Sequence, residues 1–373
     1  MNPEHREMHI GFIVVKNLLR GGGIESLTYE VGKRLVSRGH KVTVFSMGHY
    51  GEVPAMAEGM TVVSVPCLPG AATERVSASI SAILAAIVHR PKITILHLHT
   101  PMTGAFGAIA QVFGIPAVVQ LHGVDWKRSR WGFMGRTVIR ALESFVMRTS
   151  PSCTAVSKTQ CDFYESQYKR RITFIPTGTH IPQKNQDTDE IERLGLKKGE
   201  FILFASRLVP EKGAHYLISA FSKIKTNFKL VIAGGDVSAG SYPGTLKKLA
   251  GEDPRVIFPG FVEGRLKVQL LNHASIYVLP SEIEGLSISL LEAMSCGRAC
   301  LASDIPENIE AMGEAGSTFR SGNVDDLRRK LEELITRKEI RDQLGNTARL
   351  RSLTMYSWDN VTDALLKLYR ESM

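Results

Sequence analysis

The segment 205–213, ASRLVPEKG, holds two cations whose types and spacing suit phosphate binding. Arg207 offers a planar pair of N–H donors that matches phosphate oxygens, and Lys212 offers a compact point charge. Hydrogen bonds to charged groups contribute about 1.5–3 kcal/mol each. A helix is expected directly after this segment, and its N-terminus adds free N–H groups and partial positive charge. The segment can therefore hold a diphosphate and stabilise it as a leaving group; an ion pair with Glu211 inside the loop is the alternative.

A second segment, SEIEGLSISLLEAMSCG at 281–297, holds two carboxylates that suit a polyhydroxylated ligand. Glu284 and Glu292 are eight residues apart, a little over two helical turns, so they need not share one contact point. A carboxylate accepts hydrogen bonds from vicinal hydroxyls, which sugars and riboses present. We expect the N–H groups of Gly285, Leu286 and Ser287 to begin the helix and to face an anion. The alternative is a capping role for Glu284 and a solvated Glu292.

Three histidines of the first half, His97, His99 and His122, are candidate functional residues because of their places in or after apolar strands. His122 precedes Gly123 and Asp125 at the end of a strand, which favours a functional role over a structural hydrogen bond. His97 and His99 alternate on one strand, so they point to the same face, and His99 lies at the strand end as a supporting residue. No carboxylate ligand set accompanies them, and no metal site is predicted.

The elements that position these residues alternate between apolar strands and helices. In the first half we expect strands at 9–15, 41–45, 61–65, 93–98, 117–121, 153–156 and 172–175, with a glycine-rich loop at 21–23 and a helix at 25–38. In the second half we expect strands at 201–205, 229–233, 256–258, 276–279 and 299–302, with a helix at 214–224. This pattern predicts an α/β fold of two Rossmann-like, doubly wound parallel-sheet domains that face a cleft.

The predicted boundaries are 1–180 for the first domain and 181–357 for the second, with a loop-like connection at 177–200. A last helix at 358–373 can cross back to the first domain. Ligands of such sheets bind beyond the carboxyl ends of the strands. All of the residues singled out above fall at such ends.

Composition narrows the class of protein. The chain has 373 residues, of which 43% are hydrophobic and 22% charged, as in a folded globular protein of about two domains. It holds no apolar run of about 18 residues that would span a membrane. The N-terminus is expected to form a buried strand and not a signal peptide. The five cysteines lack C-x-x-C spacing, which argues against a disulfide framework and a zinc site and favours a cytoplasmic location.

The positive charge is concentrated in the first half. The net charge is +9, and residues 1–180 hold 20 basic and 11 acidic residues, which is already +9. Part of it clusters beside aromatic residues, where the basic members are Lys127, Arg128, Arg130, Arg136 and Arg140 and the aromatic ones are Trp126, Trp131 and Phe133. Such a cluster is typical of surfaces that bind nucleic acid, anionic membranes or phosphorylated acceptors. A solvated helix face is the alternative.

Several strings in this order and at these separations resemble the family 4 retaining glycosyltransferases of the GT-B fold. In the second half they are RLVPEKG, LVIAGGD, IFPGFV and PSEIEGLSISLLEAMSCGRACLASDIPE; in the first half they are GGGIESLTYEVGKRLVSRGHKVTVFS, HLHTP and LHGVDW. The resemblance covers nearly the whole chain, and the glutamate-x7-glutamate block is its most specific part. HGVDWKRSRWG resembles a subgroup that builds bacterial surface polysaccharides.

The resemblance implies roles for the donor-binding residues. Arg207 and Lys212 would grip the diphosphate of a nucleotide sugar, and Glu292 would bind its ribose. Glu284 would hold the donor sugar together with the amides of 285–287.

It also implies roles for residues nearer the base and the acceptor. The stretch 258–262, with Phe261, would lie along the base. Gly22 and Gly23 would let the first loop approach the donor phosphate or the acceptor, and His122 would face the transferring sugar. The chain departs from the family pattern at Thr94, Thr177 and Ser287.

The implied activity is transfer of a hexosyl group, with retention, to a hydroxyl of a glycan or lipid-linked acceptor in cell-surface polysaccharide or lipopolysaccharide synthesis. The leaving phosphate would help to deprotonate the acceptor, with no cofactor and no metal required. The basic half would place the enzyme on the anionic inner face of the membrane. No nucleic-acid partner is expected, and the oligomeric state stays open.

Other functions compete with this one. A nicotinamide dehydrogenase is disfavoured because the glycines form a G-G-G run, and because no acidic residue ends the second strand. A nucleotide-sugar epimerase or phosphorylase of similar fold, and a non-catalytic protein that binds nucleotide sugars, nucleic acid or membranes, remain alternatives.

Overall fold

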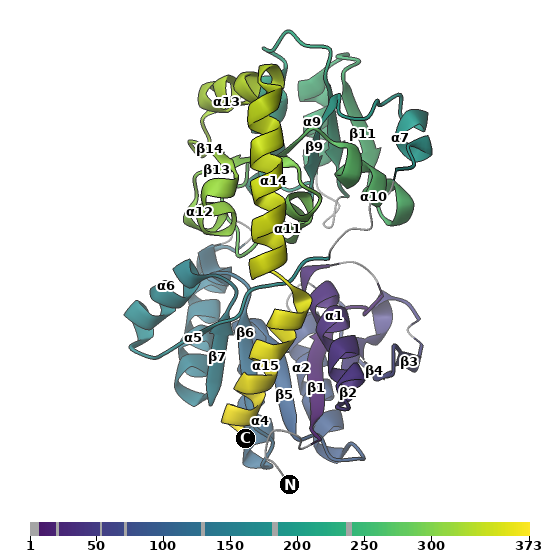
Figure 1. Cartoon of the computed structure of the whole chain (residues 1–373). Helices are drawn as coiled ribbons and strands as arrows, with labels where there is room; N and C mark the ends of the chain where they lie inside the picture. The colour runs from purple at the N-terminus through teal and green to yellow at the C-terminus, as the bar shows by residue number, and fades with distance from the viewer. Residues whose placement is uncertain are drawn as a thin grey trace. The chain divides into compact units, whose positions relative to one another are not determined.

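A computed structural model describes residues 7–19, 22–52, 54–70, 73–127, 131–180, 186–235 and 241–373. The chain forms two compact units (Figure 1). Unit 1 comprises Met1–Thr177 and Trp358–Met373, and unit 2 comprises Gly178–Ser357.

The described part of unit 1 contains one sheet of eight strands in the order β3-β4-β2-β1-β5-β6-β7-β8. All neighbours are parallel except β3 and β4. The strand order reverses between β1 and β5, which creates a switch point where ligands of such sheets bind. The strands are β1 His9–Val15, β2 Lys41–Met47, β3 Met56–Ala57, β4 Met60–Val65, β5 Ile95–His99, β6 Ala117–Leu121, β7 Ser152–Ala155 and β8 Thr173–Phe174.

Helices cover both faces of this sheet. The helices α1 and α15 pack against each other on one face, while α2, α3, α4 and α5 form the layer on the other. The helical elements are α1 Gly23–Ser37, η2 Gly48–Tyr50, α2 Thr73–Val88, α3 Thr100–Gly104, α4 Gly107–Val112, η3 Asp125–Lys127, α5 Phe133–Thr149, α6 Lys158–Tyr168 and α15 Trp358–Ser372.

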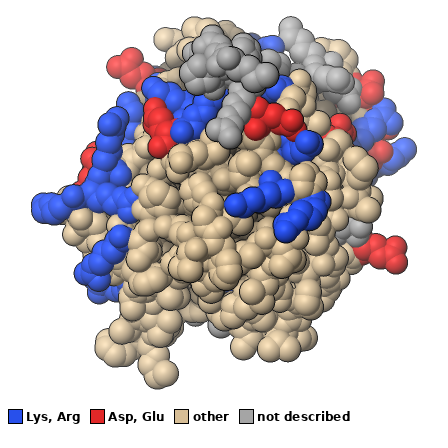
Figure 2. Space-filling view, turned by 90° about the horizontal axis from the view of Figure 1, so that it is seen from below, with Lys and Arg blue, Asp and Glu red and all other residues tan. Residues whose placement is uncertain are grey.

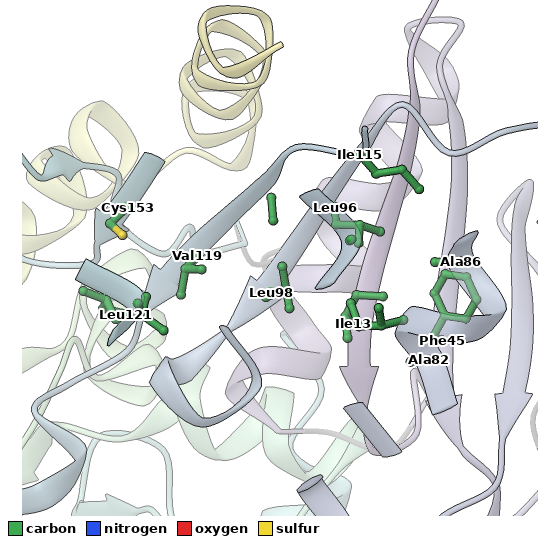
Figure 3. Close-up of a cluster of buried hydrophobic side chains, with 14 of the residues drawn as sticks. Ile13, Phe45, Ala82, Ala86, Leu96, Leu98, Ile115, Val119, Leu121 and Cys153 are labelled. Atoms are coloured by element: carbon green, nitrogen blue, oxygen red, sulfur yellow. The ribbon is translucent and has the colours of Figure 1, made fainter. Parts of the chain in front are cut away.

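Two cores follow from this layering. Figure 3 shows the core beneath α2, where Ala82 and Ala86 lie near Phe45 and Ile13, and Leu96 and Leu98 of β5 point into the same cluster. Because side chains alternate along a strand, the residue between them, His97, faces the opposite side, where Tyr369 of α15 lies.

The last helix is part of unit 1. Leu365 and Tyr369 are fully buried in the core on its side of the sheet, and Trp358 is 3% exposed. Ion pairs of α1 with α15 at the surface, Arg34 with Asp359 at 3.2 Å and Arg38 with Asp363 at 2.6 Å, accompany this packing.

The described part of unit 2 contains one sheet of six strands, all parallel, in the order β11-β10-β9-β12-β13-β14. The switch point lies between β9 and β12. The strands are β9 Phe201–Ala205, β10 Lys229–Ala233, β11 Val256–Gly260, β12 Ile276–Leu279, β13 Ala299–Ser303 and β14 Ser317–Phe319.

Helices also cover both faces of the second sheet, with α8, α9 and α13 over one core and α10, α11 and α14 over the other. The helical elements are α7 Asp189–Arg193, η4 Pro210–Lys212, α8 Ala214–Phe221, α9 Tyr242–Ala250, α10 Gly264–His273, α11 Ile288–Ser295, α12 Pro306–Met312, η5 Gly313–Ala315, α13 Val324–Thr336 and α14 Lys338–Met355.

The predicted fold class, two doubly wound α/β domains, is confirmed. Two short strands, β3 and β14, were not predicted. The loop expected at 177–200 is wrong in part. Helix α7 forms within it and packs on α10, with Ile191 and Leu196 buried and Gln269 accepting hydrogen bonds from the backbone of Glu190 and Ile191.

The burial of α15 gives a stability prediction. Leu365→Ala removes a fully buried side chain, so it should lower the free energy of unfolding by about 2–5 kcal/mol. Urea unfolding followed by circular dichroism measures this. Lys367→Ala, on the same helix, is the control: its side chain is 78% exposed, and its change should stay within about 0.5 kcal/mol. Equal stability of both variants would show that α15 does not complete the core.

Candidate active site

Three of the residues predicted from sequence in unit 2, Arg207, Lys212 and Glu284, lie in the loops at the carboxyl ends of β9 and β12, whereas Glu292 lies within α11. These strands are hydrogen-bonded neighbours at the switch point of the sheet. The loop 206–213 follows β9 and ends in the short helix η4, and the loop 280–287 follows β12 and leads into α11. The buried apolar strands fix where each loop begins.

Lys212 and Glu284 form an ion pair between these two loops. Lys212 Nζ lies 2.5 Å from Glu284 Oε1, and the two residues are 8% and 9% exposed. Each charge is largely removed from water, so each depends on the other for stabilisation. The pair thereby fixes a cation and an anion next to each other at the switch point.

Backbone contacts hold the same two loops together. The N–H of Glu282 donates to the carbonyl of Glu211 at 2.9 Å. Gly213 has φ of +69°, and a β-carbon there would overlap the carbonyl oxygen of Pro280. Only glycine permits both this conformation and this close approach. At the neighbouring strand end, Gly234 fits against the carbonyl of Ser206 in the same way.

Arg207 lies on the same loop as Lys212 but is much more exposed. Its side chain is 42% exposed, and its guanidinium lies 3.9 Å from a carboxylate oxygen of Glu211. The ion pair that the sequence left open as an alternative is therefore present at the limit of contact. Exposure leaves N–H donors of Arg207 accessible to an anion.

Glu292 and Glu284 contact different lysines. Glu292 lies on α11, and its Oε1 accepts from Lys267 Nζ of α10 at 2.7 Å. The loop 285–287 and the first turn of α11 separate the two carboxylates, which do not share a contact. Lys267 was not singled out from the sequence, because no local pattern links it to a glutamate 25 residues away.

The predicted start of this helix is wrong. Gly285 and Leu286 lie in the loop, and α11 begins at Ile288 with Ser287 as its N-cap. The Ser287 hydroxyl accepts from the N–H of Leu290, which satisfies one of the free amides of the first turn. Ser287 therefore caps the helix, and its N–H does not belong to the first turn.

A buried tyrosine ties α11 to the end of β9. The hydroxyl of Tyr277 donates to the carbonyl of Ala205 at 3.2 Å and lies 2.7 Å from Ser289 Oγ. Burial raises the pKa of Tyr277 well above its usual value, so it stays neutral. Sequence reasoning missed Tyr277, which reads as one more core residue of an apolar strand.

Phe261 follows the edge strand β11 and is 63% exposed. It packs over Gly235, at the end of β10, where a β-carbon would lie 3.3 Å from that of Phe261. An exposed aromatic face at a strand end is suited to stacking on a flat ligand.

In unit 1, the glycine loop leads into α1. Gly22 is the N-cap with extended backbone, and Gly23 is the first residue of the helix; Gly21 lies outside the described residues. The carboxylate of Glu25 in the first turn accepts from the N–H of Lys16 at 3.2 Å, which connects the helix to the end of β1.

His97, His99 and His122 lie close together in unit 1; the first two are buried and His122 is half-buried. His122 Nε2 lies 3.0 Å from His99 Nδ1, and the other nitrogen of His99 lies 3.3 Å from Thr28 Oγ1. His97 contacts Tyr369 Oη at 2.6 Å and Gln120 at 3.1 Å. The rings of His97 and His99 are 4.7 Å apart, which confirms that they share a face.

Burial keeps two of these histidines neutral. It lowers the pKa of His97 to about 3 and that of His99 well below its usual value. A neutral ring has one donor and one acceptor nitrogen, so His99 can orient His122 without adding charge beside it. Thr100, directly after His99, has φ of +71°, a strained conformation that marks this strand end.

The basic and aromatic residues near 126–148 are partly stacked. Lys127 lies 4.7 Å from the ring of Phe163, and Arg140 lies 4.4 Å from that of Trp126. Arg128 and Arg130 lie outside the described residues. Within the described ranges, no group of three or more His, Cys, Asp and Glu could hold a metal ion, and no helix is long and apolar enough to cross a membrane.

Comparisons with known proteins identify the family of the chain. Residues 21–181 match the family model "Glycosyltransferase Family 4", and residues 186–351 match "Glycosyl transferases group 1". The chain belongs to the family 4 glycosyltransferases. It is an enzyme that transfers a sugar, with retention, from a nucleotide sugar, which sets aside the epimerase and the non-catalytic protein.

An uncharacterized glycosyltransferase of Methanocaldococcus jannaschii is 27% identical over 300 residues, 76% of each chain. Among solved structures, sucrose-phosphate synthase from Thermosynechococcus elongatus has a TM-score of 0.85 at 18% identity, over 98% of this chain and 99% of that one. Anabaena HepE in complex with UDP and glucose has a TM-score of 0.81 at 20% identity, over 98% and 100%. These structures show that this glycosyltransferase has the GT-B fold.

The buried ion pair gives a stability prediction. Lys212→Met leaves Glu284 buried without its partner, so it should cost about 3–5 kcal/mol of unfolding free energy, and Glu284→Leu should cost about the same. The double variant should recover most of this loss, because no unpaired charge remains. A double-mutant cycle by urea unfolding measures the coupling. Strictly additive losses would contradict a mutually dependent pair.

The neutral histidines give a pH prediction. Between about pH 6 and pH 4 the unfolded chain protonates His97 while the folded chain does not, so stability must fall as the pH falls. Each such histidine contributes a slope of about 1.4 kcal/mol per pH unit. His97→Gln should therefore flatten the dependence by that amount in urea unfolding measured across this range. An unchanged slope would show that His97 is not held neutral.

Proposed function

We propose that this glycosyltransferase takes a hexosyl group from a nucleotide diphosphate sugar and transfers it to a hydroxyl of a glycan or lipid-linked acceptor during cell-surface polysaccharide synthesis. The observation that carries the donor half of the proposal is the Lys212–Glu284 pair at the β9/β12 switch point, with Arg207 on the same loop. The acceptor half is supported by the resemblance of HGVDWKRSRWG to enzymes of bacterial surface polysaccharides.

The donor diphosphate would bind Lys212 and Arg207. Lys212 has three N–H donors, and the contact with Glu284 uses one of them, so phosphate oxygens can share the ammonium group. Glu284 would keep its second oxygen for the sugar hydroxyls. The pair thus suits a ligand that carries acceptors and donors side by side, as a sugar diphosphate does.

The nucleoside would extend toward Glu292 and Phe261. Glu292 would accept from the ribose hydroxyls, and the exposed ring of Phe261 would lie along the base. HepE, a similar structure, was solved with UDP and glucose, which supports a nucleotide of this kind. The amides of Gly285, Leu286 and Ser287 would hold the sugar from the loop before α11, because the helix begins only at Ile288.

Transfer passes through an oxocarbenium-like state while the diphosphate leaves. Lys212, Arg207 and the N-terminus of α8 would stabilise the charge that develops on the leaving phosphate. That phosphate would then help to deprotonate the acceptor hydroxyl on the same face, without a metal ion. His122 of unit 1, oriented by the neutral His99, would support transfer, and Gly22 and Gly23 would leave room at the first loop.

The test compares turnover of variants with a matched control. Lys212→Ala and Glu284→Ala should each lower transfer at least about tenfold while circular dichroism shows folded protein, because each removes a charge-assisted contact of about 1.5–3 kcal/mol. Lys223→Ala is the control, since Lys223 is an exposed lysine of unit 2, paired with Asp325 at the surface. Turnover is measured as release of nucleoside diphosphate in the presence of acceptor lipids, across a panel of nucleotide sugars.

Wild-type turnover of both site variants would overturn the assignment of Lys212 and Glu284. Release that is equally fast without acceptor would contradict transfer and would indicate donor hydrolysis instead.

A further inference from the structure

One helix of unit 1 presents an apolar stripe to solvent. Within 76–88 of α2 the exposed positions are Val76, Ile80, Leu84 and Val88, which are 36%, 40%, 56% and 69% exposed. Their spacing of four places them along one side of the helix, and no charged residue occurs between them. A helix that only covers a core carries polar residues on its outer side. The outer side of α2 is therefore built to contact something apolar.

The neighbouring helices α4 and α5 of the same layer also expose apolar side chains. In α4, which contacts α2, Ile109 and Val112 are 40% and 84% exposed. In α5, Phe133 and Met134 are 86% and 80% exposed, and Val138 on the next turn is 57% exposed.

The exposed charged residues of α2, α4 and α5 are all basic. The acidic residues of α2, α4 and α5 are Glu74 and Glu143, and both are buried. The exposed charges of α5 are Arg136, Arg140 and Arg148. Figure 2 shows a broad uncharged area, with Lys and Arg as the charges that reach into it and Asp and Glu kept to the upper part and the edge of the view.

We infer that the exposed side of α2, α4 and α5, called here the α2–α4–α5 surface, docks on an anionic lipid bilayer. Apolar side chains on helices that lie in the interface plane enter the boundary of the acyl chains, and arginines pair with anionic headgroups at about 1 kcal/mol each. The inference deepens the proposed function, because it names the surface that brings the enzyme to a lipid-linked acceptor.

The charges and the apolar stripe together favour a bilayer over a second copy of the chain or a nucleic acid. In a two-fold dimer the same patch faces itself, so two copies would set arginines against arginines without an acidic residue of this layer to pair them. A nucleic acid would match the arginines but not a stripe of Val, Ile and Leu. A bilayer with anionic headgroups matches both.

Vesicle flotation of the full chain tests the inference. Wild-type protein should float with vesicles of phosphatidylcholine and phosphatidylglycerol, and more weakly with phosphatidylcholine alone or at high salt. The triple variant Leu84→Ser, Val112→Ser, Phe133→Ser should bind at least about tenfold more weakly, because it removes three exposed apolar side chains without opening the core. The matched control is Leu249→Ser, Leu350→Ser, which removes exposed leucines of unit 2 and should bind as wild type does.

Three outcomes would overturn the inference: no flotation of the wild type, equal flotation of the triple variant, or a wild-type dimer in sedimentation that the triple variant abolishes without any vesicle binding. Thermal stabilisation by nucleoside diphosphates is measured on the same proteins. It should persist in the triple variant, because Lys212 and Glu284 are intact. If nucleoside diphosphates fail to stabilise the wild-type protein, that result would count against the proposed donor site and not against the α2–α4–α5 surface.

Discussion

The buried ion pair between Lys212 and Glu284 is the constraint on which the site of unit 2 depends. Two opposite charges with little exposure are stable only together, so the loops that carry them must stay in register. The fit of Gly213 against Pro280 and the hydrogen bond from Glu282 to Glu211 enforce that register through the backbone. The strand order β10-β9-β12 puts both loops at the switch point, where a parallel sheet leaves room for a ligand.

At the strand ends of unit 1 the candidate residues are histidines and not an ion pair. There His97 and His99 are buried and neutral, and the hydrogen bond between His99 and His122 orients His122. Tyr369 of α15 forms a hydrogen bond with His97, so the last turns of α15 help to hold the His97 ring in place.

Much of the fold followed from sequence because continuous apolar strands such as 201–205 and 276–279 keep the same bounds in the structure. Glu284 and Lys212 could be placed at strand ends for the same reason. The predicted start of α11 was wrong because the Ser287 side chain caps the helix, and residue spacing does not reveal such a cap. Tyr277 was missed because its hydroxyl partners lie on other elements. The stripe of α2 has a spacing of four that can be seen in the sequence, but the segment 76–88 has no charged residue, and such a segment is equally consistent with a buried helix.

The most direct test of the proposed donor site is hydrogen exchange of backbone amides, measured with and without a nucleoside diphosphate that raises the melting temperature. The loops 206–213 and 280–287 lie together at the end of β9 and β12, and a diphosphate held there should slow exchange in both at once. Slowed exchange in both loops, absent in Lys212→Ala, is the predicted result. Protection confined to other segments, or equal protection in Lys212→Ala, would contradict the account.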